Sequence, residues 1–280
     1  MLKQRVAFLG AGNMAEAMIS GIVESGKFAP EQIIATNRSN QERLDTIKTK
    51  FGIEAVTKDQ LDFSKIDVFI LAMKPKDIET VLADLKNRLR PDQLLISVLA
   101  GISTSYMEDN MNERQQVIRV MPNTSSMLGE SATAISPGKH VSMDQVLLTK
   151  ELMKCIGESY IIEEDQMDIF TGIAGSGPAY FYNLMEHMEQ AGYEGGLDRE
   201  LARQIGAQTI RGAAQMMLER EETPTQLRKN VTSPNGTTAA GLEALAEHGG
   251  GKAIAEAVKG AASRSKELRE ELEKVFAEQK

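Results

Sequence analysis

The first 25 residues combine a short apolar segment, a glycine-containing turn and an amphipathic segment, and this order restricts the fold of the N-terminal half. Residues 5–9 (Arg-Val-Ala-Phe-Leu) are typical of a buried strand, residues 10–15 (Gly-Ala-Gly-Asn-Met-Ala) follow directly, and residues 16–25 have helical periodicity. The turn matches the dinucleotide-binding pattern G-x-G-x-x-A, in which Gly10 allows a tight turn and Gly12 lets the backbone approach a diphosphate. The alternative is an ordinary glycine-containing connection between a strand and a helix.

The end of the second predicted strand bears on which dinucleotide is bound. Residues 32–36 form that strand, and Asn37-Arg38-Ser39 follows it, where an NAD site would place a carboxylate for the ribose 2′-hydroxyl. The guanidinium of Arg38, with the Asn37 amide and the Ser39 hydroxyl, can instead bind a 2′-phosphate. We therefore expect NADP(H) as the preferred cofactor and NAD(H) as the alternative, unless Arg38 is only a solvated loop cation.

The rest of the first half alternates between apolar and amphipathic segments. Apolar runs at 67–73, 94–98 and 117–121 are separated by amphipathic segments at 77–89 and 104–111. This spacing predicts an α/β fold with a doubly wound, mostly parallel sheet of the Rossmann type. Ligands of such sheets bind beyond the carboxyl ends of the strands, where Ala72-Met73-Lys74-Pro75 follows one strand. Lys74 either reaches a phosphate or is a solvated residue before a helix that begins at Pro75.

The pattern changes near residues 163–165. Beyond that point helical periodicity dominates, at 167–191, 198–220, 223–231, 237–248 and 253–280. We expect a dinucleotide-binding domain at 1–162 and an all-helical dimerisation and substrate domain at 163–280. Gly175-Ser176-Gly177-Pro178 should interrupt the first of these helices. Tight helix contacts are expected at Ala202, Gly206, Ala207, Gly212, Ala213 and Ala214, and the long apolar faces predict at least a homodimer.

A second candidate anion site lies at residues 231–241 (Val-Thr-Ser-Pro-Asn-Gly-Thr-Thr-Ala-Ala-Gly). Pro234 and Gly236 break the preceding helix, Thr237 and Thr238 supply hydroxyls suited to capping, and helical periodicity then resumes. The unpaired backbone N–H groups of such a helix start bind carboxylate or phosphate. The alternative is a simple joint between two helices, but the first anion site favours a binding role here too.

Composition excludes several classes of protein. A length of 280 residues suits two domains, and a hydrophobic content of 41% excludes a disordered chain. A net charge of −8 without a basic block argues against nucleic acid as a partner. Cys155 is the sole cysteine, which leaves no internal disulfide and no thiolate metal cluster, and we expect no metal site. Without an apolar run of about 18 residues or a signal-peptide core, we expect a cytoplasmic protein with no membrane partner.

Five motifs spread over nearly the whole chain resemble the pyrroline-5-carboxylate reductase family. They are Gly-Ala-Gly-Asn-Met at 10–14, Ala-Met-Lys-Pro at 72–75, Arg-Val-Met-Pro-Asn-Thr at 119–124, Gly-Ser-Gly-Pro-Ala-Tyr at 175–180 and, above all, residues 224–245. Two departures are visible. Ser126 stands where proline is often found, and Asn235 replaces the first glycine of the usual Ser-Pro-Gly-Gly, although asparagine tolerates a left-handed backbone.

The resemblance implies reduction of L-1-pyrroline-5-carboxylate to L-proline by NAD(P)H, the last step of proline biosynthesis. It implies that the substrate carboxylate is bound by the N–H groups around Gly236, Thr237 and Thr238, with Ser233 as a further donor. The hydroxyl of Thr238, the candidate catalytic residue, then bonds the ring nitrogen. In the family, the helical domain of one subunit completes the site over the cofactor domain of another. The cofactor-binding candidates are Leu9, Gly10, Ala11, Gly12, Asn13, Met14, Asn37, Arg38, Ser39, Ala72, Met73, Lys74, Pro75 and Asn230.

Two other functions stay open on the sequence alone. One is a two-domain reductase of the hydroxyacid-dehydrogenase type, but such enzymes usually need a lysine or histidine acid, and no suitable constellation is visible. The other is a nucleotide-sensing regulatory protein that keeps the fold without the reaction, which the fold by itself does not exclude.

Overall fold

The computed structural model describes residues 2–278, with side chains through residue 275, in two compact units. Unit 1 runs to Gly175 and resumes at Gly260, and unit 2 is Ser176–Lys259. This division differs from the expected boundary at 162/163 because residues 163–175 and the C-terminal segment contact unit 1. The expected boundary stays a prediction, and residues 1, 279 and 280 of the expected domains lie outside the described residues.

Unit 1 is built on one sheet with strand order β3-β2-β1-β4-β5-β6-β7-β8. Neighbouring strands are parallel except β6 and β7, so the predicted fold class is confirmed. The strand order reverses between β1 and β4, and the carboxyl ends around such a switch point are where ligands of this fold bind. The strands are β1 (Val6–Leu9), β2 (Ile33–Asn37), β3 (Glu54–Thr57), β4 (Val68–Leu71), β5 (Leu94–Ser97), β6 (Gln116–Met121), β7 (Ser131–Pro137) and β8 (Gly157–Ile161).

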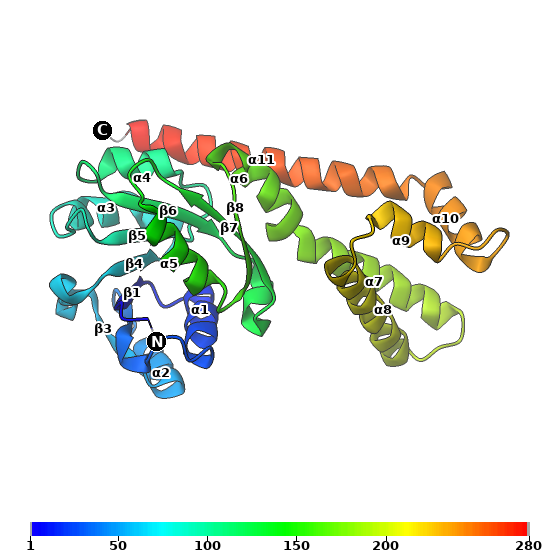
Figure 1. Cartoon of the computed structure of the whole chain (residues 1–280), viewed down its shortest axis with the longest axis horizontal. Coiled ribbons are helices and arrows are strands. Elements are labelled where there is room, and N and C mark those ends of the chain that lie inside the picture. The colour runs from blue at the N-terminus through cyan, green and yellow to red at the C-terminus, as the bar shows by residue number, and fades with distance from the viewer. Residues whose placement is uncertain (1, 279–280) are drawn as a thin grey trace. The chain divides into compact units, whose positions relative to one another are not determined.

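Helices cover both faces of this sheet (Figure 1). Helices α1 (Asn13–Glu24), α2 (Gln41–Phe51) and α5 (Met143–Met153) pack on one face, where Phe8 and Met18 are fully buried. Helices α3 (Ile78–Lys86) and α4 (Thr104–Asn110) pack on the other face. β1, β4 and β5 are buried along their whole lengths, so they appear in the sequence as continuous apolar runs.

Strands β3, β7 and β8 and helices α2 and α5 of unit 1 were not predicted from the sequence. β7 consists largely of small and hydroxyl-bearing residues, and its buried hydroxyls satisfy each other, as in the 2.9 Å bond between Ser131 and Thr133. β3 and β8 lie at the two edges of the sheet and have few buried residues. Helix α2 buries only Leu44 and Ile47, and this sparse apolar stripe gives a weak signal.

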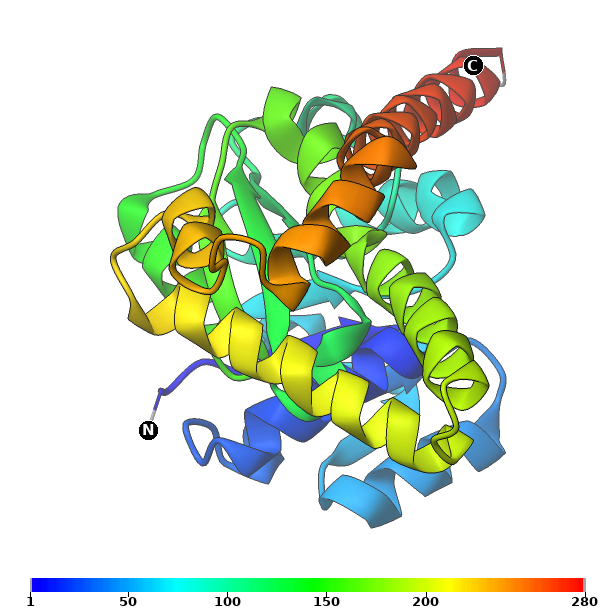
Figure 2. The same ribbon diagram turned by 90° about the vertical axis from the view of Figure 1, so that its right-hand side faces the viewer.

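The structure of the second half is helical, as predicted. It contains α6 (Met167–Phe170), a π-helical turn (Thr171–Gly175), α7 (Gly177–Glu194), α8 (Arg199–Glu219), α9 (Pro224–Asn230), α10 (Thr237–Glu247) and α11 (Gly250–Glu278). The predicted interruption at residues 175–178 overlaps the last residue of the π-helical turn and the start of α7. Helices α7 and α8 form a hairpin (Figure 2). Within it Gly206 packs against Met185, and Gly192 against Ala202, so the predicted tight contacts are confirmed at Gly206 and Ala202.

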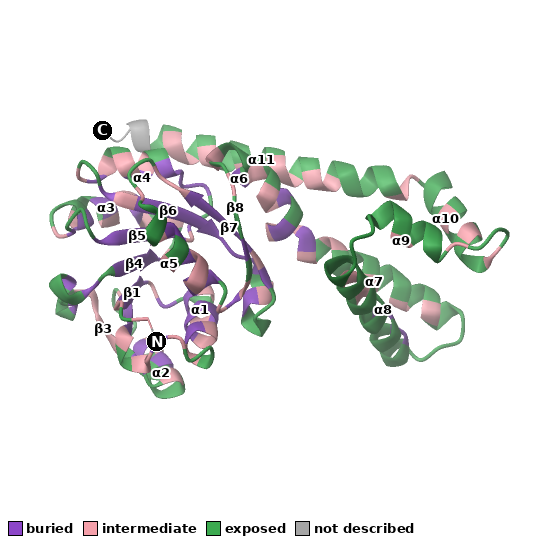
Figure 3. Ribbon diagram, in the orientation of Figure 1, coloured by how far each residue is buried: buried purple, intermediate pink, exposed green. Residues whose placement is uncertain are grey.

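Unit 2 buries very little of its own apolar surface (Figure 3). Gly177, Ala202 and Gly206 are its only buried residues. Large apolar side chains stand exposed instead, among them Phe181, Tyr182, Ile205, Met217 and Leu218. Exposed apolar surface of this extent marks an interface with another chain.

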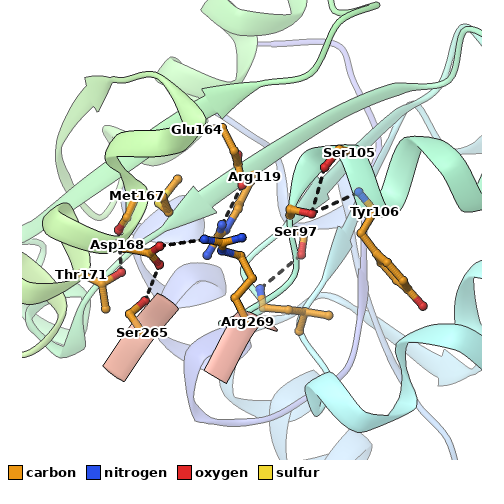
Figure 4. A network of polar contacts seen from close by, with 12 residues as sticks. Ser97, Ser105, Tyr106, Arg119, Glu164, Met167, Asp168, Thr171, Ser265 and Arg269 are labelled. Atoms are coloured by element: carbon orange, nitrogen blue, oxygen red, sulfur yellow. Dashed lines mark hydrogen bonds and ion pairs between the residues drawn. The ribbon is translucent and has the colours of Figure 1, made fainter. Parts of the chain in front are cut away.

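The C-terminal part of α11 is held on unit 1 by polar contacts (Figure 4). Asp168 accepts hydrogen bonds from the Ser265 hydroxyl at 2.8 Å and from the Arg269 guanidinium at 3.1 Å. Nearby, the buried guanidinium of Arg119 donates to the Glu164 carboxylate at 2.7 Å. The two contacts of Asp168 join the segment from Gly260 to the rest of unit 1.

We predict that Arg269→Ala lowers the free energy of unfolding of unit 1 by about 1–3 kcal/mol, because it leaves the largely buried Asp168 carboxylate without its cation. Urea denaturation measures the effect. Arg264→Ala is the matched control, since among the described side chains the exposed Arg264 pairs with glutamates of its own helix alone, and it should change the midpoint little. Equal shifts for the two variants would contradict the assignment.

Candidate functional site

The glycine turn after β1 runs directly against the turn after β4. Gly10 has φ +125°, and a Cβ on it would overlap the carbonyl group of Ala72. The backbone N–H of Gly10 donates to the Thr36 carbonyl at 3.1 Å, and that of Ala72 to the Leu9 carbonyl at 3.0 Å. The predicted cofactor residues 9–14, 37–39 and 72–75 therefore meet at one edge of the sheet, around the switch point.

The start of α1 offers unpaired amides and open space. Gly12 is the N-cap, no side chain caps the helix, and a Cβ on Gly12 would meet nothing within 4 Å. Within residues 2–278, no acceptor is hydrogen-bonded to the backbone N–H groups of Asn13, Met14 or Ala15. Such a helix start binds phosphate. These residues fit the diphosphate of a dinucleotide.

The loop after β2 is shaped by the Asn37 side chain, whose oxygen accepts the N–H groups of Ser39 and Asn40, both at 3.3 Å. Arg38 is exposed, and no carboxylate in the described part of the chain pairs with it. Its guanidinium is thus available for an anion. Lys74 is likewise exposed, and it precedes the short 3₁₀ turn Pro75–Asp77.

An ion cluster beside the glycine turn has no counterpart in the sequence patterns. The Arg43 guanidinium donates from Nε to the Ala11 carbonyl at 2.7 Å and from Nη2 to the Glu16 carboxylate. Lys50 also donates to Glu16, at 2.8 Å. Hydrogen bonds from Lys50 and Arg43 lower the pKa of the Glu16 carboxyl. Arg43 and Glu16 are 27 positions apart, and only the packing of α1 beside α2 brings them together.

Asn123 lies in one of the motifs on which the family resemblance rests, and it contacts Ala174, the residue just before another of them. Its buried side-chain amide donates to the Ala174 carbonyl in the π-helical turn at 3.0 Å, and its side-chain oxygen accepts the Ser125 N–H at 3.0 Å. The backbone N–H of Asn123 donates to the Ser131 hydroxyl at 3.0 Å. Asn123 therefore fixes the turn after β6 to the π-helical turn that follows α6, which is a structural role.

The second candidate site is the start of α10 in unit 2. A tight turn precedes it, in which the Gly236 N–H donates to the Ser233 carbonyl at 3.1 Å and Asn235 has φ +59°. Asn235 replaces the first glycine of the usual Ser-Pro-Gly-Gly, and its backbone is left-handed, a conformation that asparagine tolerates. Among the described residues, no acceptor is bonded to the N–H groups of Thr237, Thr238 or Ala239.

Two details of the predicted second site are wrong. Thr237 and Thr238 do not cap α10, because Gly236 is the N-cap and no side chain caps this helix. The N–H of Gly236 is not available to a ligand, because it closes the turn. The threonines are the first two residues of the helix, and both are exposed. Asn230 ends α9, and its side-chain oxygen accepts from Gln226 at 2.7 Å.

Comparison with known proteins identifies the family. Residues 164–268 match the family model for pyrroline-5-carboxylate reductase dimerisation, and residues 5–101 match that for coenzyme F420-dependent NADP oxidoreductases. The chain is 58% identical over 275 residues to pyrroline-5-carboxylate reductase 1 of Bacillus subtilis, covering 98% of this chain and 93% of the relative. The chain belongs to the pyrroline-5-carboxylate reductase family. It is therefore an NADP(H)-dependent oxidoreductase, as the sequence predicted.

Solved structures agree with this assignment. A pyrroline-5-carboxylate reductase from Coxiella burnetii has a TM-score of 0.88 at 34% identity, covering 95% of this chain and 99% of that one. The Plasmodium falciparum enzyme, with NADP bound, has a TM-score of 0.85 at 29% identity, covering 96% and 99%. The dimerisation match falls on the helices whose apolar side chains are exposed, and it supports the predicted homo-oligomer.

No group of three or more metal-ligating side chains occurs among residues 2–275, whose side chains the structure describes. None of the helices in that range is both long enough and apolar enough to cross a bilayer.

We predict that Gly10→Ala and Gly12→Ala have different effects. Gly10→Ala should lower the thermal unfolding temperature, because its Cβ overlaps the Ala72 backbone at a φ that alanine avoids. Gly12→Ala should leave unfolding nearly unchanged, since its Cβ meets no protein atom, yet weaken NADPH binding by filling the space beside the unpaired amides. Calorimetry measures both quantities, and undiminished NADPH affinity of Gly12→Ala would contradict this placement of the diphosphate.

Proposed function

We propose that this chain reduces L-1-pyrroline-5-carboxylate to L-proline with NADPH and binds both anionic ligands at helix N-termini. The α1 start binds the cofactor diphosphate, and the α10 start binds the substrate carboxylate. The observation that carries this proposal is the pair of helix starts with unpaired amides, in a chain whose family performs the reaction. Members of this family catalyse the last step of proline biosynthesis, so we place the reaction in the cytoplasm.

The nucleotide is held by the edge of the sheet around β1, β2 and β4. The backbone amides of residues 12–14 bind the diphosphate, and Leu9 with residues 72–75 borders it. Arg38, supported by Asn37 and Ser39, binds the 2′-phosphate, because its planar guanidinium suits phosphate geometry and has no carboxylate partner among the described residues. When bound, NADPH supplies the hydride that adds to the imine carbon of the substrate.

The substrate carboxylate is held by the N–H groups of Thr237 and Thr238, with the Ser233 hydroxyl as a further donor. Gly236 contributes by lacking a side chain, since a Cβ there would overlap the Ser233 hydroxyl. The positive end of the helix dipole adds to the attraction. The amides also fix the direction in which the ring lies, because their own direction is set by the helix.

Thr238 is the proposed catalytic residue, and it donates its hydroxyl to the ring nitrogen as that nitrogen becomes an amine. A threonine hydroxyl is too weak an acid to protonate the ring alone. The imine therefore arrives protonated or takes its proton through water. The overall change adds a hydride at the imine carbon and a proton at the nitrogen, while the cofactor is oxidised.

In this proposal two subunits together form each complete active site. The helical part of one subunit supplies the α10 start and Asn230, and the cofactor part of another subunit supplies the glycine turn. The dimerisation match over 164–268 and the exposed apolar side chains of unit 2 support it. The start of that match also supports the expected domain boundary at 162/163.

We predict that Thr238→Ala lowers turnover roughly 10- to 100-fold, because the ring nitrogen loses a hydrogen-bond donor in the transition state, while NADPH affinity stays the same. Loss of NADPH absorbance with pyrroline-5-carboxylate measures turnover. Thr225→Ala, an exposed threonine on α9, is the control and should behave like the native enzyme. Native-like turnover of Thr238→Ala removes Thr238 from the mechanism, and a native protein without activity refutes the proposed function.

We predict that Arg38→Ala weakens NADPH binding roughly tenfold or more and NADH binding little, because only NADPH carries the 2′-phosphate. Titration of both nucleotides measures the two dissociation constants. Lys48→Ala, which removes an exposed cation of α2, controls for the change in net charge. Equal losses for NADPH and NADH would refute the 2′-phosphate assignment.

A further inference from the structure

Arg43 connects α2 to the glycine turn and to α1 at the same time. It is the third residue of α2, and its backbone N–H is fixed by the side chain of the N-cap residue, Asn40, at 2.9 Å. Its side chain is only 25% exposed. Two of its guanidinium nitrogens are engaged, Nε with the Ala11 carbonyl and Nη2 with the Glu16 carboxylate.

Glu16 determines the orientation of the Arg43 guanidinium. It lies in the first turn of α1, its side chain is 22% exposed, and it accepts from Lys50 as well. Because a guanidinium is planar, two bonds to different partners leave it no freedom to turn. Arg43 therefore links α2 rigidly to Glu16 of α1 and to the Ala11 carbonyl of the glycine turn.

The bond to the Ala11 carbonyl has a consequence for the next amide. The carbonyl of Ala11 and the N–H of Gly12 belong to one planar trans peptide, in which the two groups point in opposite directions. Fixing the carbonyl toward Arg43 thus fixes the Gly12 N–H away from it. Glycine restricts its own backbone least of all residues, so the restraint must come from outside the turn.

We propose that Arg43 is a positioning residue that orients the Ala11–Gly12 peptide, so that the Gly12 amide is preset to bind the diphosphate of the dinucleotide. This inference rests on the proposed cofactor role of the turn. No acceptor within residues 2–278 is bonded to the Gly12 N–H, which leaves this amide available to a ligand. NADPH and NADH have the same diphosphate, so Arg43 affects both equally, whereas Arg38 distinguishes between them.

The test compares Arg43→Lys with Lys50→Met in the full-length protein. Arg43→Lys keeps the charge but replaces the planar fork by a single ammonium group, which cannot reproduce both bonds in their geometry. Lys50→Met removes the other cation on Glu16 and leaves the Ala11 bond in place. Calorimetric titration of NADPH and NADH gives the affinities. Hydrogen exchange without nucleotide reports the order of the turn through the Gly10 and Glu16 amides, which donate to Thr36 and Gly12.

We expect Arg43→Lys to weaken NADPH and NADH by the same factor, about tenfold or 1.4 kcal/mol, without changing the KM for pyrroline-5-carboxylate. Exchange at Gly10 and Glu16 should become faster, and Lys50→Met should match the native protein in every measurement. A loss confined to NADPH, an equal loss in Lys50→Met, or unchanged exchange in Arg43→Lys would each overturn the proposal. If the native protein binds neither nucleotide, the proposed function fails, and the exchange data still decide whether Arg43 orders the turn.

Discussion

The close approach of two turns, after β1 and after β4, is the constraint on which the cofactor half of the molecule depends. Only a glycine fits at position 10, since any side chain would overlap the backbone of Ala72. This contact lies where the strand order reverses. It brings the start of α1, with its unpaired amides, the end of β2 and residues 72–75 to a common edge of the sheet.

The starts of α1 and α10 both have unpaired backbone N–H groups, but different parts of the structure support them. The α1 start depends on strands far apart in the sequence and on Arg43, which reaches it from another helix. The α10 start depends on a local turn of four residues, in which Asn235 takes a left-handed conformation. Unit 2, which carries the α10 start, buries only three small residues by itself. The exposed apolar side chains of its helices agree with the dimerisation match, so in the proposed function assembly and substrate binding depend on the same unit.

The sequence predicted the parts of the fold that have strong local signals. The buried central strands β1, β2, β4, β5 and β6 appear as apolar runs, and the predicted interruption at 175–178 corresponds to the π-helical turn and the start of α7. The edge strands and β7 were missed because half-buried or hydroxyl-rich strands lack such runs. The capping role of Thr237 and Thr238 was predicted wrongly, because a hydroxyl one residue past the cap looks the same in sequence as a cap.

By itself, the sequence determined the fold class and the family, and it located the two helix starts that we propose as anion sites. Their local signals are glycine where a turn is tight and small residues where a helix begins. The tertiary structure alone decided which distant residues support them. The contact of Gly10 with Ala72, the bond from Arg43 to Ala11 and the attachment of Arg269 to Asp168 join positions 32 or more residues apart. Such pairings are set by how the sheet and helices pack in three dimensions, and no local pattern encodes them.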